Sequence, residues 1–80
     1  MAEITALFFA YAADRMSGRK KQFEVPDGIT IEEFFDQDLA DALNEPIGSF
    51  MFSVNADWAE RSRPLRDGDE LAVIPPVSGG

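Results

Sequence analysis

The chain of 80 residues contains no cysteine and no histidine. Without cysteine it can form neither a disulfide nor a thiolate nucleophile, and without histidine it lacks the commonest general base and a usual zinc ligand. These absences argue against a self-contained hydrolase or a metalloenzyme, and no metal site is expected.

Basic charge is also scarce. Seven Lys and Arg stand against fifteen Asp and Glu, which gives a net charge of −8 at pH 7. Such a chain repels phosphate backbones and anionic membrane surfaces, so neither nucleic acid nor membrane is an expected partner. The apolar start, residues 1–12, contains Glu3 and has no basic leader, so we expect no signal peptide and a cytoplasmic location.

Hydrophobic residues make up 45% of the chain and aromatic residues 11%, which is the composition of a folded domain. A chain this short fills only one core. We expect a single domain over residues 1–74, followed by a tail over residues 75–80.

The first half of the chain reads as a hairpin and a helix. Residues 4–13 are apolar at both odd and even positions, which predicts a central strand that is covered on both faces. After a turn at Ser17-Gly18, polar and apolar residues alternate over residues 22–25, which predicts an antiparallel return strand. Thr30 and Glu33 then form a capping-box pattern. The helical face that follows consists of apolar residues three or four apart: Ile31, Phe34, Phe35, Leu39, Ala42 and Leu43. The acids outside this face are either a docking surface for a basic partner or a solvated helix surface.

Further strands are expected over residues 50–54, 58–59 and 70–74. This order predicts an α+β, ubiquitin-like β-grasp fold: a mixed sheet of four to five strands, with its first and last strands adjacent and one helix on one face. The residues expected to face the helix are Ile4, Ala6, Phe8, Ala10, Leu71 and Val73. The opposite, uncovered face should carry Leu7, Phe9, Tyr11 and Ile74.

The carboxyl end is the most unusual feature. Pro75 and Pro76 cannot continue a central strand, so the chain is expected to leave the domain there as an arm that reaches about 20 Å. Gly79 and Gly80 lack side chains, so the terminal carboxylate could pass through a narrow channel. The alternative is a ragged terminus without function.

Four segments together point to a known family: Leu7-Phe8-Phe9-Ala10, the turn at Asn55, residues 64–70 (Pro-Leu-Arg-Asp-Gly-Asp-Glu) and residues 75–80 (Pro-Pro-Val-Ser-Gly-Gly). The chain resembles, over its whole length, the small, sulfur-carrying subunit of molybdopterin synthase, a ubiquitin-like β-grasp sulfur carrier. Residues 29–48 match least well.

The resemblance implies that Gly80 carries the chemistry. An E1-like activating enzyme, using ATP and Mg²⁺, would adenylate its carboxylate, and a sulfur-donating enzyme would then turn it into a thiocarboxylate. The tail, made of Pro75, Pro76, Val77, Ser78, Gly79 and Gly80, would enter the large subunit of molybdopterin synthase and give sulfur to cyclic pyranopterin monophosphate. The chain itself would bind no cofactor and supply no acid or base.

The resemblance also implies a partner interface at Phe9, Trp58 and Ile74. Alternatively Trp58 caps the core, and Phe9 lies in the core if a bulge inverts the strand parity. Arg61, Arg63 and Arg66 either meet acids of the activating enzyme or merely offset the acidic helix, and they receive no role.

Three other functions remain open from the sequence. Gly80 could be joined to lysines of other proteins, as in a ubiquitin-like modifier. The sulfur could instead serve thiamine, cysteine or natural-product synthesis. The domain could also be a passive interaction module whose tail is incidental.

Overall fold

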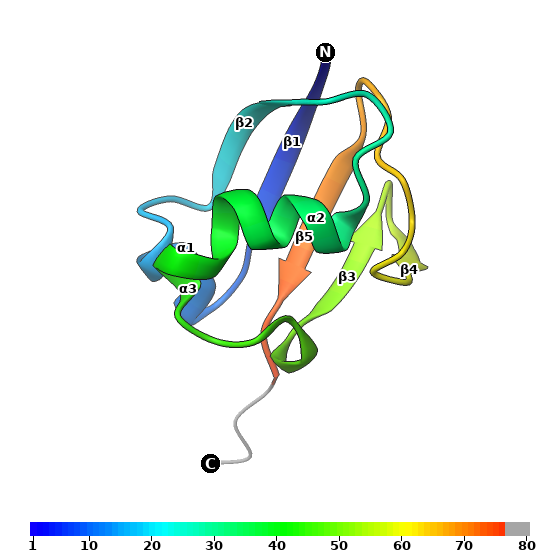
Figure 1. Cartoon of the computed structure of the whole chain (residues 1–80). Coiled ribbons are helices and arrows are strands. Elements are labelled where there is room, and N and C mark those ends of the chain that lie inside the picture. Colours follow the sequence, from blue (N-terminus) through cyan, green and yellow to red (C-terminus); the bar gives the residue numbers. More distant parts are fainter. Residues whose placement is uncertain (77–80) are drawn as a thin grey trace.

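A computed structural model describes residues 1–76 (Figure 1). Within that range a mixed sheet has the strand order β2-β1-β5-β3-β4 and one long helix crosses one of its faces, which confirms the β-grasp prediction. The strands are β1 (Ala2–Phe8), β2 (Lys20–Val25), β3 (Met51–Val54), β4 (Asp57–Ala59) and β5 (Glu70–Ile74). The helical segments are α1 (Tyr11–Arg15), α2 (Ile31–Phe34), η1 (Phe35–Leu39), α3 (Ala40–Leu43) and η2 (Ile47–Ser49). The segments α2, η1 and α3 follow one another without a gap and together form the long helix.

The first and last strands lie side by side at the sheet centre, as expected. β1 pairs antiparallel with β2 and parallel with β5, where Leu7 lies opposite Ala72. β5 also pairs antiparallel with β3, which places Ile74 opposite Met51. Because parallel neighbours need a long crossover, the helix between them is positioned to cover one side of the sheet. The chain therefore reaches its carboxyl end from the middle of the sheet.

The predicted first strand over residues 4–13 is wrong in its second half. β1 ends at Phe8, and the chain turns at Ala10, with φ 52° and ψ −134°, before entering α1. The turn is closed by the amide of Ala12, which donates to the carbonyl of Phe9 at 3.0 Å. Ala10 is consequently exposed instead of facing the helix, and Tyr11 lies on α1 and not on the sheet. A run that is apolar at both parities fits a packed helix as well as a buried strand, so the pattern could not separate the two.

The capping box at the start of the long helix is confirmed. The amide of Glu33 donates to Thr30 Oγ1 at 3.1 Å, and the amide of Thr30 donates to Glu33 Oε1 at 2.9 Å. Hydrogen bonds from the Thr30 backbone and side chain lower the pKa of the Glu33 carboxyl. The helix therefore begins where the sequence predicts it.

The buried helix face departs from the prediction only at Ala42. Ile31, Phe34, Phe35, Leu39 and Leu43 are buried, whereas Ala42 is exposed. The middle segment η1 is a π-helical turn, which takes more residues per turn than an α-helix. The inward positions after Phe35 therefore fall four residues apart, at Leu39 and Leu43, and Ala42 turns outward.

Two of the sequence segments behind the family resemblance are hydrogen-bonded to each other. Asn55 Nδ2 donates to Oδ1 of the buried Asp69 at 2.9 Å, and the amide of Glu70 donates to Asn55 Oδ1 at 2.9 Å. The other carboxylate oxygen of Asp69 accepts from the amide of Arg66 at 2.8 Å. This network ties the β3–β4 turn to the start of β5 and so fixes where the last strand begins.

A glycine at position 56 is expected to stabilise the domain. Asn55 and Ala56 form a two-residue turn between paired Val54 and Asp57, and both have positive φ, 51° and 73°. Alanine in this left-handed conformation costs about 1 kcal/mol, and Asn-Gly is the preferred pair for such a turn. Ala56→Gly should therefore raise the free energy of unfolding in urea by about 1 kcal/mol. The matched change Ala42→Gly, on the exposed side of α3, should lower it by about 0.5–1 kcal/mol. A loss of stability in both variants would contradict the turn assignment.

Candidate functional site

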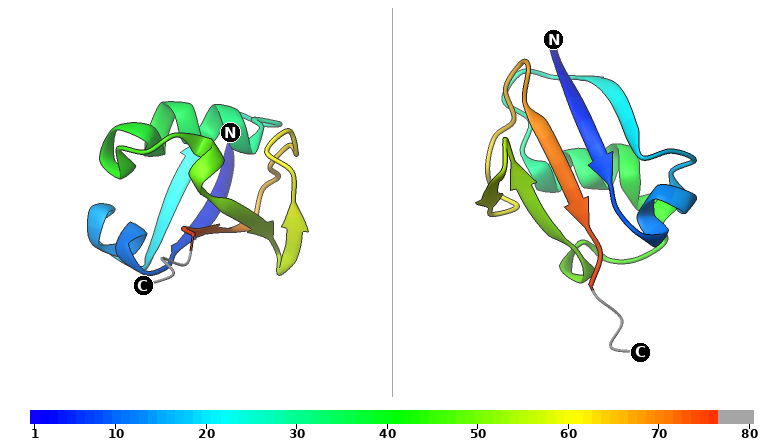
Figure 2. Two further views of the ribbon diagram at one scale, coloured as in Figure 1. Left: turned by 90° about the horizontal axis from the view of Figure 1, so that it is seen from below. Right: turned by 180° about the vertical axis from the view of Figure 1, so that it is seen from behind.

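The side of the sheet away from the long helix carries the candidate site. No other segment of residues 1–76 covers this side (Figure 2). We call it the open face, and define it by the apolar side chains that strand register and alternation place there: Leu7, Phe9, Met51, Trp58, Ala72 and Ile74. An apolar surface left uncovered in this way is typical of a protein-binding site.

Trp58 and Phe9 are both exposed on the open face. Trp58, on the edge strand β4, is 67% exposed, so it does not cap the core. Phe9 is 47% exposed, while its neighbour Phe8 is buried under the helix, so the strand parity is not inverted. Their contact with a partner remains a prediction, but the structure places both where a partner could reach them.

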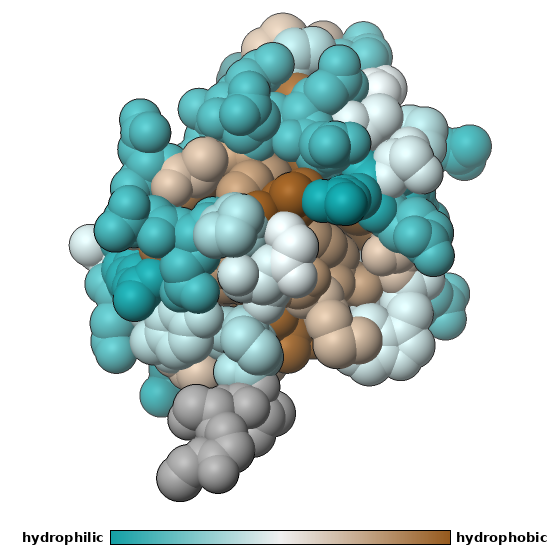
Figure 3. All heavy atoms as spheres, turned by 60° about the horizontal axis from the view of Figure 1, so that its bottom comes forward, coloured by the Kyte–Doolittle hydropathy of each residue, from teal (hydrophilic) through white to brown (hydrophobic). Residues whose placement is uncertain are grey.

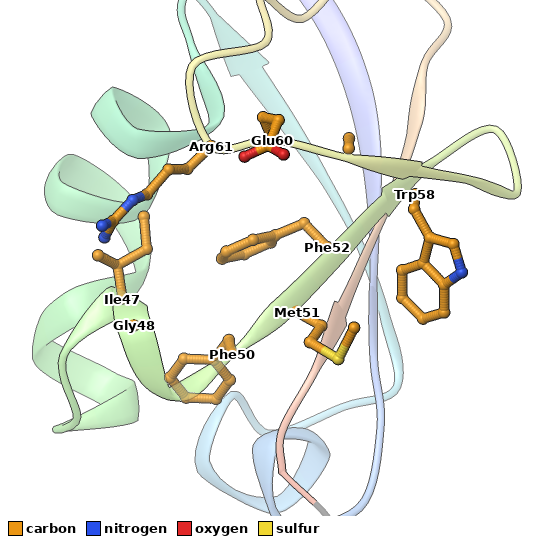
Figure 4. A pocket seen from close by; sticks show the side chains of 9 residues that line it. Ile47, Gly48, Phe50, Met51, Phe52, Trp58, Glu60 and Arg61 are labelled. Carbon is orange, nitrogen blue, oxygen red and sulfur yellow. The ribbon is translucent and has the colours of Figure 1, made fainter.

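Met51 is a member of the open face that the sequence reasoning missed. It is 57% exposed and lies opposite Ile74 in the β3–β5 register. Met51 and Trp58 point away from Phe52, which is buried toward the helix (Figure 4). The alternation of Met51-Phe52-Ser53-Val54, with Phe52 and Val54 inward, was the signal that could have identified it.

The end of β5 leads directly from this face to the predicted tail. Ile74 is half-buried, Pro75 is buried and Pro76 is exposed. The structure thus packs Pro75 with the domain, although the sequence analysis placed it in the arm. Val77, Ser78, Gly79 and Gly80, including the carboxylate expected to carry the chemistry, lie outside the described residues. Figure 3 is turned so that this end of the molecule comes forward, and it shows apolar residues in the middle of the surface with hydrophilic residues around them.

A hollow of about 340 Å³ lies at the β4 edge of the sheet, between η2, β3 and β4 (Figure 4). Phe50 and Phe52 form its floor, and Glu60 and Arg61 lie at its margin. Within residues 1–76 no buried side-chain nitrogen or oxygen lacks a hydrogen-bond partner. Among residues 1–76 the hollow therefore contains no buried polar side chain left unpaired for a ligand, and Arg61 gains no role from it.

The acids of the long helix are exposed on the far side of the sheet from the open face: Glu32, Glu33, Asp36, Asp38 and Asp41. Over the described part of the chain, salt bridges join only the amino terminus to Asp27 and Arg15 to Glu45. The helix acids therefore form a solvated surface in the isolated domain. In the same range no group of acids could hold a metal ion. No helix in residues 1–76 is both long and apolar enough to span a membrane.

Comparisons with known proteins agree with this geometry. The ThiS family profile matches residues 6–80. The molybdopterin synthase sulfur carrier subunit of Chlamydomonas reinhardtii is 33% identical, over 98% of this chain and 99% of its own length. The crystal structure of SAMP1, small archaeal modifier protein 1, from Haloferax volcanii is 26% identical, with a TM-score of 0.80 over 99% of this chain and 100% of that one.

A solved complex also contains a chain of this fold. In the complex of subunits 1 and 2 of the molybdopterin-converting factor from Helicobacter pylori, the matching chain is 22% identical. Its TM-score is 0.67, over 98% of this chain and 99% of that one. At this identity the likeness shows the shared fold.

Proposed function

The chain belongs to the ThiS family of β-grasp sulfur carriers, and from this premise we propose that it is the sulfur-carrier subunit of a molybdopterin synthase. The observation that carries the proposal is the match to the Chlamydomonas reinhardtii subunit, which runs over nearly the full length of both chains. The ThiS family profile also supports the proposal, because it runs from residue 6 to residue 80 and so spans the open face and the Gly-Gly end.

The proposed chemistry takes place at the carboxylate of Gly80. A carboxylate is a poor electrophile, so its oxygen first attacks the α-phosphate of ATP in an E1-like enzyme, which releases pyrophosphate and leaves an acyl adenylate. Hydrosulfide supplied by the sulfur source then attacks the acyl carbon, the bond to the phosphate oxygen breaks and AMP departs, which leaves a thiocarboxylate. ATP and Mg²⁺ are used by the activating enzyme, and this chain supplies only the acyl group.

The proposed acceptor partner is the large subunit, in which the thiocarboxylate gives sulfur to cyclic pyranopterin monophosphate. The Helicobacter pylori complex of subunits 1 and 2 supports a partner of this kind. The open face would bind the partner while the residues after Pro75 extend into its active site. The acids, bases and phosphate ligands of the transfer would belong to the large subunit.

The test follows the mass of the intact protein. After incubation with the activating enzyme, ATP, Mg²⁺ and a sulfur source, the chain should gain the mass difference between sulfur and oxygen, located at Gly80 by fragmentation. The thiocarboxylate form, mixed with the large subunit and cyclic pyranopterin monophosphate, should then yield the dithiolene product. A chain that gains no sulfur under these conditions would contradict the proposal.

A second function is favoured by the likeness to SAMP1, which is named as a protein modifier, small archaeal modifier protein 1. The same acyl adenylate would then react with a lysine amine and form an isopeptide bond. Conjugates linked through Gly80 in extracts of the source cells, together with no dithiolene product, would support the modifier function over the sulfur-carrier function.

A further inference from the structure

A larger hollow lies at the end of β1, between that strand, α1 and the start of β2. It has a volume of about 780 Å³ and opens to solvent. We call it the α1 hollow and define it by an apolar floor, Leu7, Phe9 and Ala13, and a charged rim, Asp14, Arg19 and Lys20. The rim is notable in a chain of net charge −8, because it contains two of the seven basic residues.

The α1 hollow is continuous with the open face. Leu7 lies opposite Ala72 in the parallel β1–β5 pair, and the amide of Phe9 donates to the carbonyl of Val73 at 3.4 Å. The floor of the hollow is thus adjacent to the last residues of β5, from which the chain leaves the sheet. A protein that holds the residues after Pro76 and also covers the open face would meet this hollow.

Within the described part of the chain, the basic side chains at the rim have no acidic partner of their own. Over residues 1–76 neither Arg19 nor Lys20 forms a salt bridge, and Asp14 is the one acid in the lining. The nearby Arg15 is different. Its Nη1 donates to Glu45 Oε2 at 2.7 Å and to the carbonyl of Leu43 at 2.6 Å, so its charge is already used within the domain.

Arg15 holds α1, which carries the lining residues Ala13 and Asp14, against the end of α3 through its hydrogen bond to the Leu43 carbonyl. Its guanidinium also lies 4.6 Å from the centre of the Tyr11 ring, within α1 itself. Partial burial raises the pKa of the Tyr11 phenol, and the nearby Glu45 carboxylate adds to this effect. Because Arg15 is paired with Glu45, the cationic charge available to a partner at this end is that of the rim.

Lys20 and Lys21 project to opposite sides of the sheet, and only Lys20 lines the α1 hollow. Lys20 lies opposite Leu7 in the β1–β2 register, so its side chain is on the open face. Lys21 is on the helix side, like Phe23, whose ring centre is 5.0 Å from that of Phe34. Two adjacent exposed lysines thus point to opposite sides of the sheet.

From these observations, and resting on the proposed function, we propose that the α1 hollow receives an apolar segment of the large subunit that carries a carboxylate. An apolar side chain of that segment would cover Phe9 and Leu7, and the carboxylate would face Arg19 and Lys20. Charges are screened beyond roughly 8 Å at physiological salt, so these local cations, and not the distant helix acids, determine which groups are favoured here. Complementary charge of this kind fixes the orientation of docking more than it adds affinity.

The test compares two charge reversals in association with the large subunit. Lys20→Glu and Lys21→Glu change the net charge equally, so long-range repulsion affects both variants to the same extent. We expect Lys20→Glu to slow association by about tenfold, and Lys21→Glu to leave it nearly unchanged. Lys20→Arg, which keeps the charge, should associate like the unmodified chain.

Carbodiimide cross-linking of the unmodified chain provides a second measurement that needs no charge-reversed variant. It should join the amine of Lys20, and not that of Lys21, to an Asp or Glu of the large subunit. Equal slowing by both charge reversals, or cross-links at Lys21 in place of Lys20, would overturn the assignment of the α1 hollow while leaving the proposed function intact. Failure of the unmodified chain to bind the large subunit would overturn both.

Discussion

A chain lengthened by one alanine after Gly80 is expected to accept no sulfur and to support no detectable formation of the dithiolene product. The added residue moves the terminal carboxylate one residue further from the domain and places a Cβ next to it. In the proposed mechanism this side chain would obstruct the narrow channel of the partner, and misplacement of a reacting group by about 1 Å already costs about 100-fold in rate. Intact-protein mass spectrometry after incubation with the activating enzyme, ATP and a sulfur source measures the loss.

The matched control carries the same alanine at the other end, before Met1. There it disturbs only the exposed ion pair of the amino terminus with Asp27, at 3.4 Å, which contributes little to stability. This variant should gain sulfur at the rate of the unmodified chain. If the chain extended after Gly80 still gained sulfur, the proposal that the carboxylate of Gly80 carries the sulfur would be contradicted.

Replacement of Trp58 by alanine should weaken binding to the large subunit by roughly 30-fold, about 2 kcal/mol, because large exposed aromatic side chains are the commonest binding hot spots. Trp58 is 67% exposed in the isolated domain, so its truncation removes little packing. The free energy of unfolding should therefore change by less than about 0.5 kcal/mol. Isothermal titration with the large subunit and urea unfolding measure the two quantities separately.

Gln37→Ala is the control for this prediction. Gln37 is exposed on η1, on the side of the sheet opposite to Trp58. Its truncation should leave binding to the large subunit within a factor of two or so of the unmodified chain, as for most surface changes outside an interface. If Gln37→Ala weakened binding as much as Trp58→Ala, the partner would be docking on the helix side, and the open face would lose its assigned role.

Much of the candidate site could be predicted from local patterns. The exposure of Phe9 and its position on the uncovered face follow from strand alternation, and the structure confirms both. Met51 was missed although the alternation of residues 51–54 points it away from the core. Its place beside Ile74 could not be predicted locally, because it depends on the pairing of β3 with β5.

Two predictions from hydrophobic spacing are wrong for the same reason. The spacing predicts a single strand that ends at Ala13, and it predicts that Ala42 lies on the buried face of the helix. Both predictions assume a regular backbone, whereas the chain changes its geometry in both segments. One change is the turn at Ala10 and the other is the π-helical turn over Phe35–Leu39. Spacing reports the average period of a segment and does not show where the backbone leaves it.

The sequence by itself determined the features that depend on neighbours along the chain. These are the capping box at Thr30, the stiff prolines before the glycine pair, and the lack of cysteine and histidine, which removes thiolate and imidazole groups from this chain. Only the tertiary structure decided which distant residues share a surface. Strand pairing brought Phe9, Met51, Trp58 and Ile74 to one face, and it decided that Lys20 lies on that face and Lys21 on the other. The physical reason is that local propensity depends on chain neighbours, whereas a binding face is built by hydrogen-bonded register between strands far apart in the sequence.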